Sequence, residues 1–192
     1  MTRVFAYLFA ALVVLAVAGP AQAQEMDMRS LFSGGPNFFG GGGGSSPIQR
    51  TTVSYDGSYA PGTIVINTAE RRLYLVMPNG QALRYGIGVG RDGFRWSGTH
   101  RISAKKEWPS WTPPSQMLRR RPDLPRHMRG GIDNPLGARA MYLGSTLYRI
   151  HGSNEPETIG QAVSSGCFRM TNEDVTDLYS RVSVGTPVVV KN

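Results

Sequence analysis

The sequence predicts a mainly β fold that carries one C-terminal helix and one long proline-rich loop. Short apolar runs and alternating segments, separated by turn residues, fill the chain from residue 61 onward, as in β proteins. Only residues 171–182 show a clear helical period, and the stretch Lys105–Pro135 has many prolines and no clear period. Residues 61–192 are long enough to form one domain with its own hydrophobic core.

The expected strands begin with a meander and continue in shorter segments along the domain. Pro78-Asn79-Gly80 is a turn signal between two of the first strands. Apolar or alternating residues predict strands at Thr63–Asn67, Arg72–Met77, Gln81–Gly90, Thr99–Ala104, Ala140–Leu143, Thr146–His151 and Pro187–Val190.

The expected helix directly follows the segment that contains the only cysteine. Thr171 and Asp174 resemble a capping box at its start. One face of the helix is apolar and comprises Val175, Leu178, Tyr179 and Val182. The loop Lys105–Pro135 has a length that, in compact domains, often belongs to a lid or a binding element.

The N-terminus has the three parts of a secretory signal peptide. Arg3 supplies the basic region, Val4–Ala18 the apolar run, and Ala21-Gln22-Ala23 a small-x-small cleavage site. The alternative is a membrane anchor, but the run is shorter than the roughly 20 apolar residues that cross a bilayer. We therefore expect residues 1–23 to be a signal peptide for the general secretory route. The mature protein is then expected in the periplasm or cell envelope, without a membrane span.

Residues 24–60 are expected to be a flexible linker. They are rich in glycine, serine and other polar residues, including the run GGPNFFGGGGGSSP. Such a segment buries too little apolar surface to offset the entropy lost on ordering.

The charge is concentrated in the middle of the chain. The whole chain has a formal net charge of +8, whereas residues 81–150 hold thirteen Arg or Lys and four acidic residues, a net charge of +9. Such a one-sided field attracts anionic partners. Nucleic acid does not suit an exported chain without a nucleic-acid motif. An envelope polymer that bears carboxylates fits better, and a solvated basic surface is the plain alternative.

Cys167, the only cysteine, lies in surroundings that favour a reactive thiol. A lone cysteine is most often a small buried hydrophobic residue. An exported chain with one cysteine cannot form an internal disulfide, however, and Gly166 permits a sharp turn that points amides at a substrate oxygen. The helix expected near Thr171 also biases the thiol toward the thiolate.

A cysteine nucleophile needs a base, because a free thiol has a pKa of about 8.5. His151 ends an expected strand and precedes Gly152, which suits a side chain that reaches the cysteine segment. His100 lies inside an expected strand and His127 in the proline-rich loop. We expect both to be structural or solvent-exposed. A metal site is the competing use of Cys and His, but the sequence has no set of three or four ligands at a recognisable spacing.

The residues around this pair resemble the signature of the L,D-transpeptidase catalytic domain family, also called YkuD-like. The similar residues are His151-Gly152 and Ser164-Ser165-Gly166-Cys167-Phe168-Arg169-Met170. The segments PGTIVINTAERRLYLV, NPLGARAMYLG and NEDVTDLYSRVSVGTPVVV are similar to the family as well, so the resemblance covers about Pro61 to Val190. It implies a barrel-like or sandwich fold with the cysteine in a groove.

The resemblance implies a role for each motif residue. Cys167 would be the nucleophile, His151 its base, and the Gly152 carbonyl would hold the imidazole in the useful tautomer. The amides of Ser165, Gly166 and Cys167 would form the oxyanion hole. For Arg169, contact with the substrate or the thiol loop and a structural pairing with a carboxylate or carbonyl both remain open.

Two positions depart from the common family pattern. Many members have histidine where this chain has Ser165, so any role of that imidazole is absent here, although a backbone amide survives the exchange. Trp96-Ser97-Gly98 stands where Pro-Thr-Gly is commoner. Trp108 and Trp111 either line the substrate path or pack under the long loop.

The implied reaction acts on peptidoglycan stem peptides and needs no cofactor or metal. The thiolate would attack the carbonyl of the third stem residue, usually diaminopimelate, release the terminal D-alanine and form a thioester. An amine of another stem or of an envelope protein would resolve the thioester, whereas water would make the protein an L,D-carboxypeptidase. A non-catalytic wall-binding protein is the alternative from another class. A papain-like hydrolase fits less well, because its cysteine commonly precedes its histidine.

Overall fold

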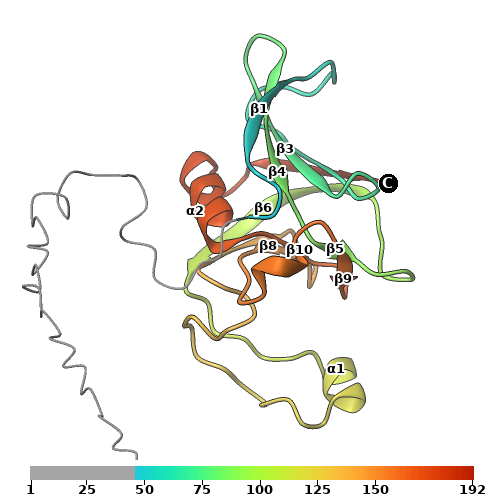
Figure 1. Cartoon of the computed structure of the whole chain (residues 1–192), viewed down its shortest axis with the longest axis vertical. Coiled ribbons are helices and arrows are strands. Elements are labelled where there is room, and N and C mark those ends of the chain that lie inside the picture. The colour runs from blue at the N-terminus through green and yellow to red at the C-terminus, as the bar shows by residue number, and fades with distance from the viewer. Residues whose placement is uncertain (1–45) are drawn as a thin grey trace, which may run out of the picture. The chain divides into compact units, whose positions relative to one another are not determined.

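The computed structural model describes residues 46–192, so the expected signal peptide and the first part of the expected linker lie outside the described residues. The described part is mainly β, with a nine-stranded sheet in the order β1-β4-β3-β2-β11-β6-β7-β8-β10 and a parallel pair β5-β9 (Figure 1). The strands are β1 (Thr51–Ser54), β2 (Ile64–Asn67), β3 (Arg72–Met77), β4 (Gln81–Gly86), β5 (Val89–Gly90), β6 (Gly98–Glu107), β7 (Arg139–Leu143), β8 (Arg149–His151), β9 (Ala162–Ser164), β10 (Phe168–Arg169) and β11 (Pro187–Lys191). The helices are α1 (Ser115–Arg120), the short 3-10 helix η1 (Pro156–Thr158) and α2 (Asn172–Arg181).

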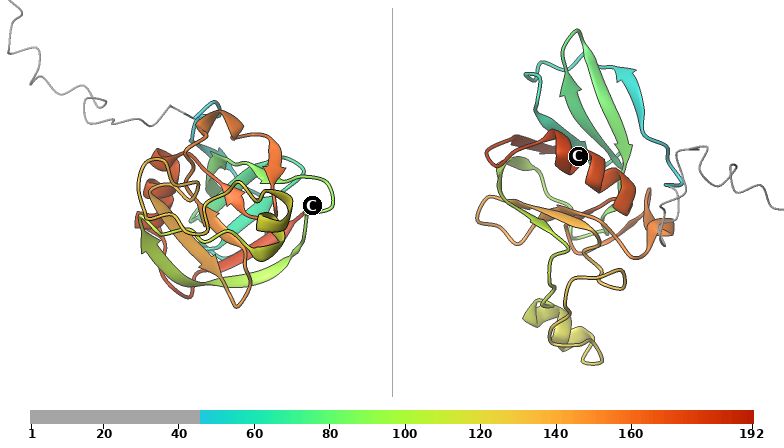
Figure 2. Two further views of the ribbon diagram at one scale, coloured as in Figure 1. Left: turned by 90° about the horizontal axis from the view of Figure 1, so that it is seen from below. Right: turned by 90° about the vertical axis from the view of Figure 1, so that its left-hand side faces the viewer.

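The sheet curls until its two sides meet, which confirms the barrel-like expectation. The segment just after β4 reaches the last strand, because Gly88 and Arg169 exchange main-chain hydrogen bonds of 2.9 Å. β4 therefore lies near one side of the sheet, while its continuation pairs with β10 on the other side. The view from below shows the strands arranged around a common centre (Figure 2).

The core fills the interior of this curled sheet. Successive side chains of a strand point to opposite faces of the sheet, so every second residue along a strand faces the interior. One cluster of buried side chains extends from β2 and β3 to α2 and β11, and its largest fully buried members are Tyr85, Phe168, Ile64, Ile66, Leu73, Ile87, Ile102, Met141, Leu143, Ile150, Met170 and Leu178.

The expected meander is confirmed, and its turn has the predicted chemistry. β2 pairs with β3 and β3 with β4, all antiparallel. Asn79 and Gly80 have φ of 61° and 65°, the left-handed region that Asn and Gly tolerate best in a tight hairpin.

Helix α2 is confirmed, together with its N-cap. Thr171 accepts a hydrogen bond of 3.2 Å from the Asp174 amide, and Val175 and Leu178 are fully buried against the core. At the other end, the Lys105 ammonium donates to the carbonyls of Tyr179 and Val182. A cation at this place satisfies carbonyls that the helix leaves open.

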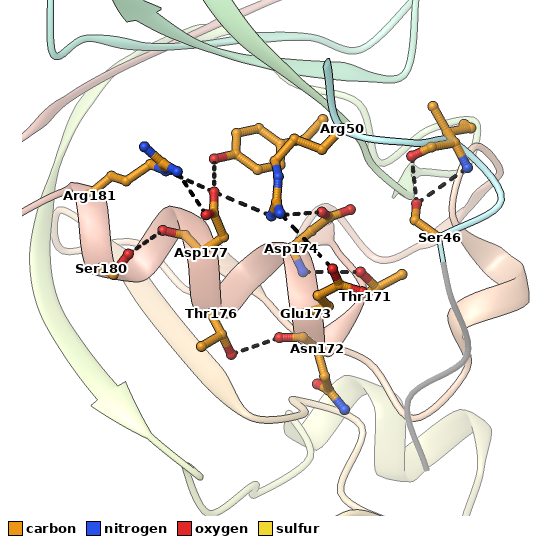
Figure 3. Close-up of polar contacts among 12 residues, drawn as sticks. Ser46, Arg50, Thr171, Asn172, Glu173, Asp174, Thr176, Asp177, Ser180 and Arg181 are labelled. Carbon is orange, nitrogen blue, oxygen red and sulfur yellow. Dashed lines mark hydrogen bonds and ion pairs between the residues drawn. The ribbon is translucent and has the colours of Figure 1, made fainter. Parts of the chain in front are cut away.

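Arg50 fastens the start of the described chain to α2. Its guanidinium lies 3.3 Å from both Asp174 and Asp177 and 4.0 Å from Glu173 (Figure 3). Asp177 also accepts a hydrogen bond of 2.6 Å from the Tyr85 hydroxyl, so the ion cluster connects the segment before β1 to both α2 and β4.

The expectation of a flexible linker up to residue 60 is wrong for β1. Thr51 to Ser54 pair with the outer edge of β4 in the antiparallel sense. The sequence did not reveal this strand because its side chains are mostly exposed, so no apolar alternation marks it. What holds β1 is main-chain pairing and the Arg50 cluster.

The long loop begins later than expected, after Glu107, and contains a short helix and a β-bridge. β6 continues through Lys105 and Lys106 to Glu107, paired with β7, although charged side chains hide the strand pattern. A bridge joins Trp111 to Met128, and α1 lies between them at the tip of the loop, far from β1 to β4 (Figures 1 and 2).

Three further elements differ from the sequence-based expectation. β8 starts only at Arg149, because Thr146 caps a turn by donating to the Leu143 carbonyl and accepting from the Tyr148 amide. β9 and β10 have three and two residues, which is too short for a period to show.

Among residues 46–192, no helix is both long and apolar enough to cross a membrane.

Candidate active site

The cysteine loop joins β9 to β10 and lies beside the end of β8. β8 and β10 pair in parallel, with Phe168 opposite Ile150 and Arg169 opposite His151. Phe168 and Ile150 are both buried in the core. Alternation along each strand therefore places Cys167 on the same outer face as His151.

His151 is buried, and its tautomer is fixed by the chain itself. Its Nδ1 lies 2.6 Å from the Gly152 carbonyl oxygen, which can only accept a hydrogen bond, so Nδ1 carries the proton. The lone pair of Nε2 is then available to accept a proton. Burial lowers the pKa of His151 to about 3; the hydrogen bond to Gly152 opposes this change, and the cations Arg169 and Arg149 add to it. The imidazole is therefore neutral near pH 7.

The Cys167 thiol lies between main-chain groups and two arginines. Its Sγ is 3.8 Å from the Leu147 carbonyl oxygen. Burial raises the pKa of the Cys167 thiol, whereas the charge and hydrogen-bonding groups of Arg149, and then the charge of Arg169, act in the opposite direction. The Cys167 thiol and the His151 imidazole therefore both rest in their neutral forms near pH 7.

Gly166 has a conformation and a location that only glycine fits. Its φ is 109°, a region that other residues rarely adopt, and a Cβ would meet the Tyr148 ring at 2.5 Å. The Gly166 amide donates to the Ser164 hydroxyl at 3.1 Å, and that hydroxyl donates to the Cys167 carbonyl at 2.6 Å. Within the described chain, the amides of Ser165 and Cys167 have no hydrogen-bond partner. The Gly166 amide, expected in the oxyanion hole, is thus already used inside the turn.

Trp96 supports the cysteine loop from the side, a role that the sequence did not reveal. Its indole N–H donates a hydrogen bond of 2.9 Å to the Gly166 carbonyl. The ring stacks on Tyr148 with centroids 4.5 Å apart and also contacts Phe168 and His100. The departure from the common family pattern therefore places an aromatic support under the loop.

Arg169 takes the structural alternative in this structure. Its guanidinium donates to the Glu155 carboxylate at 2.7 Å. Glu155 follows the His151-Gly152 pair by a few residues, so the ion pair joins the cysteine strand to the loop behind the histidine.

Gly152 lies where a side chain has no room. A Cβ there would collide with the Asn172 side chain, which accepts a hydrogen bond of 2.8 Å from the Ala138 amide. The first residue of α2 thus packs directly against the main chain that carries the His151 partner carbonyl.

A cavity of about 300 Å³ lies next to the cysteine loop. One wall comes from α1 and the residue before it, and the other from the cysteine loop and the β7–β8 turn. Arg120 of α1 lies over the ring of Phe94, a lining residue from the β5–β6 segment, at 5.6 Å. The lining residues are Phe94, Pro114, Gln116, Met117, Arg120, Leu147, Tyr148 and Ser165.

The other two histidines and the two tryptophans of the long loop do not line this cavity. His127 is exposed and contacts Thr112, and His100 lies in β6 beside Trp96. Trp108 and Trp111 are not among the lining residues of the cavity; Trp108 is 44% exposed and Trp111 pairs with Met128. Among the described residues, no three His, Cys, Asp or Glu side chains gather as a metal site would require.

Comparisons with known proteins agree on one family. The L,D-transpeptidase catalytic domain (YkuD) matches residues 61–190. The probable L,D-transpeptidase ErfK/SrfK of Escherichia coli is 40% identical over 136 residues, which is 66% of this chain and 43% of that protein. The probable L,D-transpeptidase YbiS of the same organism is 43% identical over 135 residues, 65% of this chain and 43% of that protein. The chain thus spans less than half the length of these curated relatives.

Solved structures show the same fold. An L,D-transpeptidase from Mycobacterium smegmatis matches with a TM-score of 0.55 and 18% identity, over 68% of this chain and 58% of that one. A Brucella melitensis protein described as a probable carnitine operon oxidoreductase is 50% identical, with a TM-score of 0.50 over 74% of this chain and 93% of that one. The family match, the named relatives and the fold carry the same conclusion: the chain belongs to the L,D-transpeptidase catalytic domain family.

Proposed function

We propose that this chain is a peptidoglycan L,D-transpeptidase that acts through a Cys167–His151 dyad. The observation that carries the proposal is the 2.6 Å hydrogen bond from His151 Nδ1 to the Gly152 carbonyl, on the face that Cys167 shares. A base must present a free lone pair to the nucleophile, and this bond leaves Nε2 in that form. The family membership supplies the substrate class.

In the first half-reaction, the thiol proton passes to His151 Nε2 while Sγ attacks the carbonyl carbon of the third stem residue. The carbonyl oxygen gains negative charge, and the amides of Ser165 and Cys167, which have no partner within the described chain, would bind it. When the tetrahedral intermediate collapses, the bond to the terminal D-alanine breaks. The imidazolium returns its proton to the departing amine, and a thioester remains on Cys167.

In the second half-reaction, an amine attacks the thioester carbonyl and His151 accepts the amine proton. The product carries a new amide bond, and Cys167 leaves as the thiol after it regains that proton. An amine from another stem gives a cross-link between two third residues, and an amine from an envelope protein attaches that protein to the wall. The chemistry uses only groups of the chain and its substrates, and with the expected signal peptide it supports the periplasm or cell envelope as the proposed location.

Arg169 and the cavity complete the proposed site. The Arg169–Glu155 ion pair holds the loop after His151, so we assign Arg169 to positioning. The cavity between α1 and Ser165 is the proposed place for the stem peptide, and the α1 loop shields the thioester from water.

The acceptor is tested by incubating residues 24–192 with disaccharide tetrapeptide and separating the products by liquid chromatography and mass spectrometry. A transpeptidase gives cross-linked dimers and released D-alanine. Tripeptide monomer as the only product, with no added amine incorporated, would make the enzyme an L,D-carboxypeptidase. No D-alanine at all would support a wall-binding protein. Cys167→Ala serves as the blank in each case.

A further inference from the structure

Arg149 lies beside the cysteine, and the proposed chemistry leaves its cation without a role. It stands two residues before His151 on β8, so both side chains project from the same face of the strand. The parallel pairing of Phe168 with Ile150 makes Arg149 the cross-strand neighbour of Cys167. Burial raises the pKa of the Cys167 thiol, and the Arg149 charge acts in the opposite direction.

The guanidinium is held in this place by an aromatic ring. Arg149 pairs with Tyr142 across β7 and β8, and its Cζ lies 5.2 Å from the centre of the Tyr142 ring. Lys106 lies over the same ring at 5.8 Å. A cation over a ring face is attracted by the ring quadrupole, so Tyr142 fixes the guanidinium without neutralising it.

The Arg149 charge is not spent on a carboxylate. In the described part of the chain, no Asp or Glu lies within ion-pair distance of it, and its buried Nε has no hydrogen-bond partner. The other charged or titratable groups that face the thiol are Arg169 of β10 and His151 of β8. Arg169 is paired with Glu155, and His151 is neutral. Arg149 is therefore the permanent cation that faces the sulfur without an acidic partner.

We propose that Arg149 stabilises the Cys167 thiolate and so sets how much reactive nucleophile the enzyme holds. The inference rests on the proposed function in one respect, that Cys167 is the nucleophile. In many cysteine enzymes a protonated histidine supplies the positive charge beside the sulfur. Here the neutral, buried His151 serves as base, and the arginine on the same strand supplies the charge.

The test measures thiol reactivity with iodoacetamide, a neutral reagent that needs no wall substrate. The thiolate displaces iodide and forms one S–C bond, and because Cys167 is the only cysteine, intact mass reports this site alone. The rate is measured from pH 5 to 10 for the wild type, Arg149→Gln, Arg149→Lys and Tyr142→Leu. Arg101→Gln is the matched control, since Arg101 is exposed and bonds the distant Gly185 carbonyl.

We expect Arg149→Gln to move the profile to higher pH, because the thiol pKa rises when the cation is lost. At pH 7, each unit by which the thiol pKa rises lowers the thiolate fraction about ten-fold. The alkylation rate falls by the same factor. Arg149→Lys should restore most of the rate, Tyr142→Leu should move the profile less, and Arg101→Gln should leave it in place.

The outcomes separate this proposal from a role in folding or in substrate binding. If Arg149→Gln does not fold, as judged by circular dichroism, the profile of Tyr142→Leu decides. An unchanged profile in the folded variants overturns the proposal. A raised KM for disaccharide tetrapeptide with an unchanged alkylation profile also overturns it and assigns Arg149 to substrate binding. The alkylation assay contains no muropeptide. Failure of the proposed transpeptidase reaction would therefore show only in the product assay with disaccharide tetrapeptide, and not in the alkylation profile.

Discussion

At the scale of single residues, the site depends on which groups are charged before the reaction starts. Burial favours the neutral forms of both Cys167 and His151, so the dyad is better described as a thiol with a neutral base than as a preformed ion pair. The Gly152 carbonyl fixes the tautomer, and the glycine cannot be replaced because Asn172 occupies the space of a Cβ. Burial therefore sets the protonation state of the pair, and the Gly152 main chain sets the orientation of the imidazole.

The buried histidine makes stability depend on pH in a defined window. The folded-state pKa of His151 is about 3, below the value near 6.5 in the unfolded chain, so between these values the unfolded state binds the extra proton. We expect the free energy of unfolding to fall as the pH drops from 6.5, by at most about 1.4 kcal/mol per pH unit from this group. Melting temperatures from pH 7.5 to 4.5 should fall less steeply for His151→Gln than for the wild type. Parallel curves for the two proteins would contradict the assignment.

Trp96 is the residue whose replacement should separate activity from stability. Trp96→Phe keeps an aromatic ring but loses the hydrogen bond to the Gly166 carbonyl, worth about 1 kcal/mol. Since this bond positions the cysteine turn, we expect the acylation rate to fall about ten-fold or more while the fold persists. Disaccharide tetrapeptide, the proposed acyl donor, is the reagent. Its adduct is followed by intact mass, with thermal unfolding measured in parallel. If the acylation rate falls only in proportion to the fraction of folded protein at the assay temperature, Trp96 has no positioning role.

At the scale of elements, helix α2 links the site to the start of the domain. Its first residue packs against Gly152, its N-cap follows the cysteine strand, and its outer face holds Arg50 through acidic side chains (Figure 3). The segment before β1 thus contributes to the surface that keeps α2 in place. The boundary of the folded unit lies before Arg50 and not at residue 60.

Removal of Arg50 should destabilise the domain more than removal of the arginine that shares its partner. Arg50→Ala leaves the largely buried Asp174 without its cation, and we expect a loss of about 1–3 kcal/mol in the free energy of unfolding. Arg181→Ala also removes a cation from Asp177. The Arg181 side chain is 47% exposed, so the loss should stay below about 1 kcal/mol. Urea unfolding of both variants makes the comparison. Equal losses would show that the Arg50 cluster adds no more than a surface ion pair.

At the scale of the whole molecule, a curled β sheet carries a basic loop on one side of the site. The strands from β6 to β10 fix the dyad, while the loop with α1 forms the opposite wall of the cavity. Residues 108–135 of this loop hold five arginines and two aspartates, a net charge of +3. Stem peptides carry carboxylates, so the field is expected to raise their rate of encounter with the site.

The electrostatic contribution should appear as a salt effect that depends on the charge of the reagent. Between 20 and 300 mM NaCl, we expect the kcat/KM for release of D-alanine from disaccharide tetrapeptide to fall several-fold, because salt screens exposed charges. Alkylation by neutral iodoacetamide should change little over the same range. If both rates fall together, the salt acts on the protein itself, and if neither falls, the basic field plays no part in binding.

The fold could be predicted from the sequence wherever one face of an element is buried. β3 was predicted to the residue, since Leu73 and Leu75 alternate with less buried residues, and α2 was predicted from its apolar face. β1 could not be found because main-chain pairing holds it and its side chains are exposed. β9 and β10 are too short for a pattern, and their partners lie far away in the sequence.

The site could be predicted only as far as its local motif reached. Cys167, His151 and Gly152 lie in two short segments whose chemistry is readable from the chain. Arg149 was visible only as one basic residue among many, although its place two residues before His151 on a strand puts it on the same face. Trp96 contacts the Gly166 carbonyl through the folding of a distant loop, and no local pattern carries that information.

The central claim is that Cys167 carries the acyl group, and the mass of the intact enzyme tests it most directly. The protein is mixed with disaccharide tetrapeptide, quenched in acid within seconds and measured, with peptide mapping to locate the adduct. The account predicts a gain equal to the mass of disaccharide tetrapeptide less that of D-alanine, on Cys167 in the wild type. The adduct should form about 10²–10⁴-fold more slowly in His151→Ala and be absent from Cys167→Ala. Continued release of D-alanine by folded Cys167→Ala, or an adduct at another residue, would contradict it.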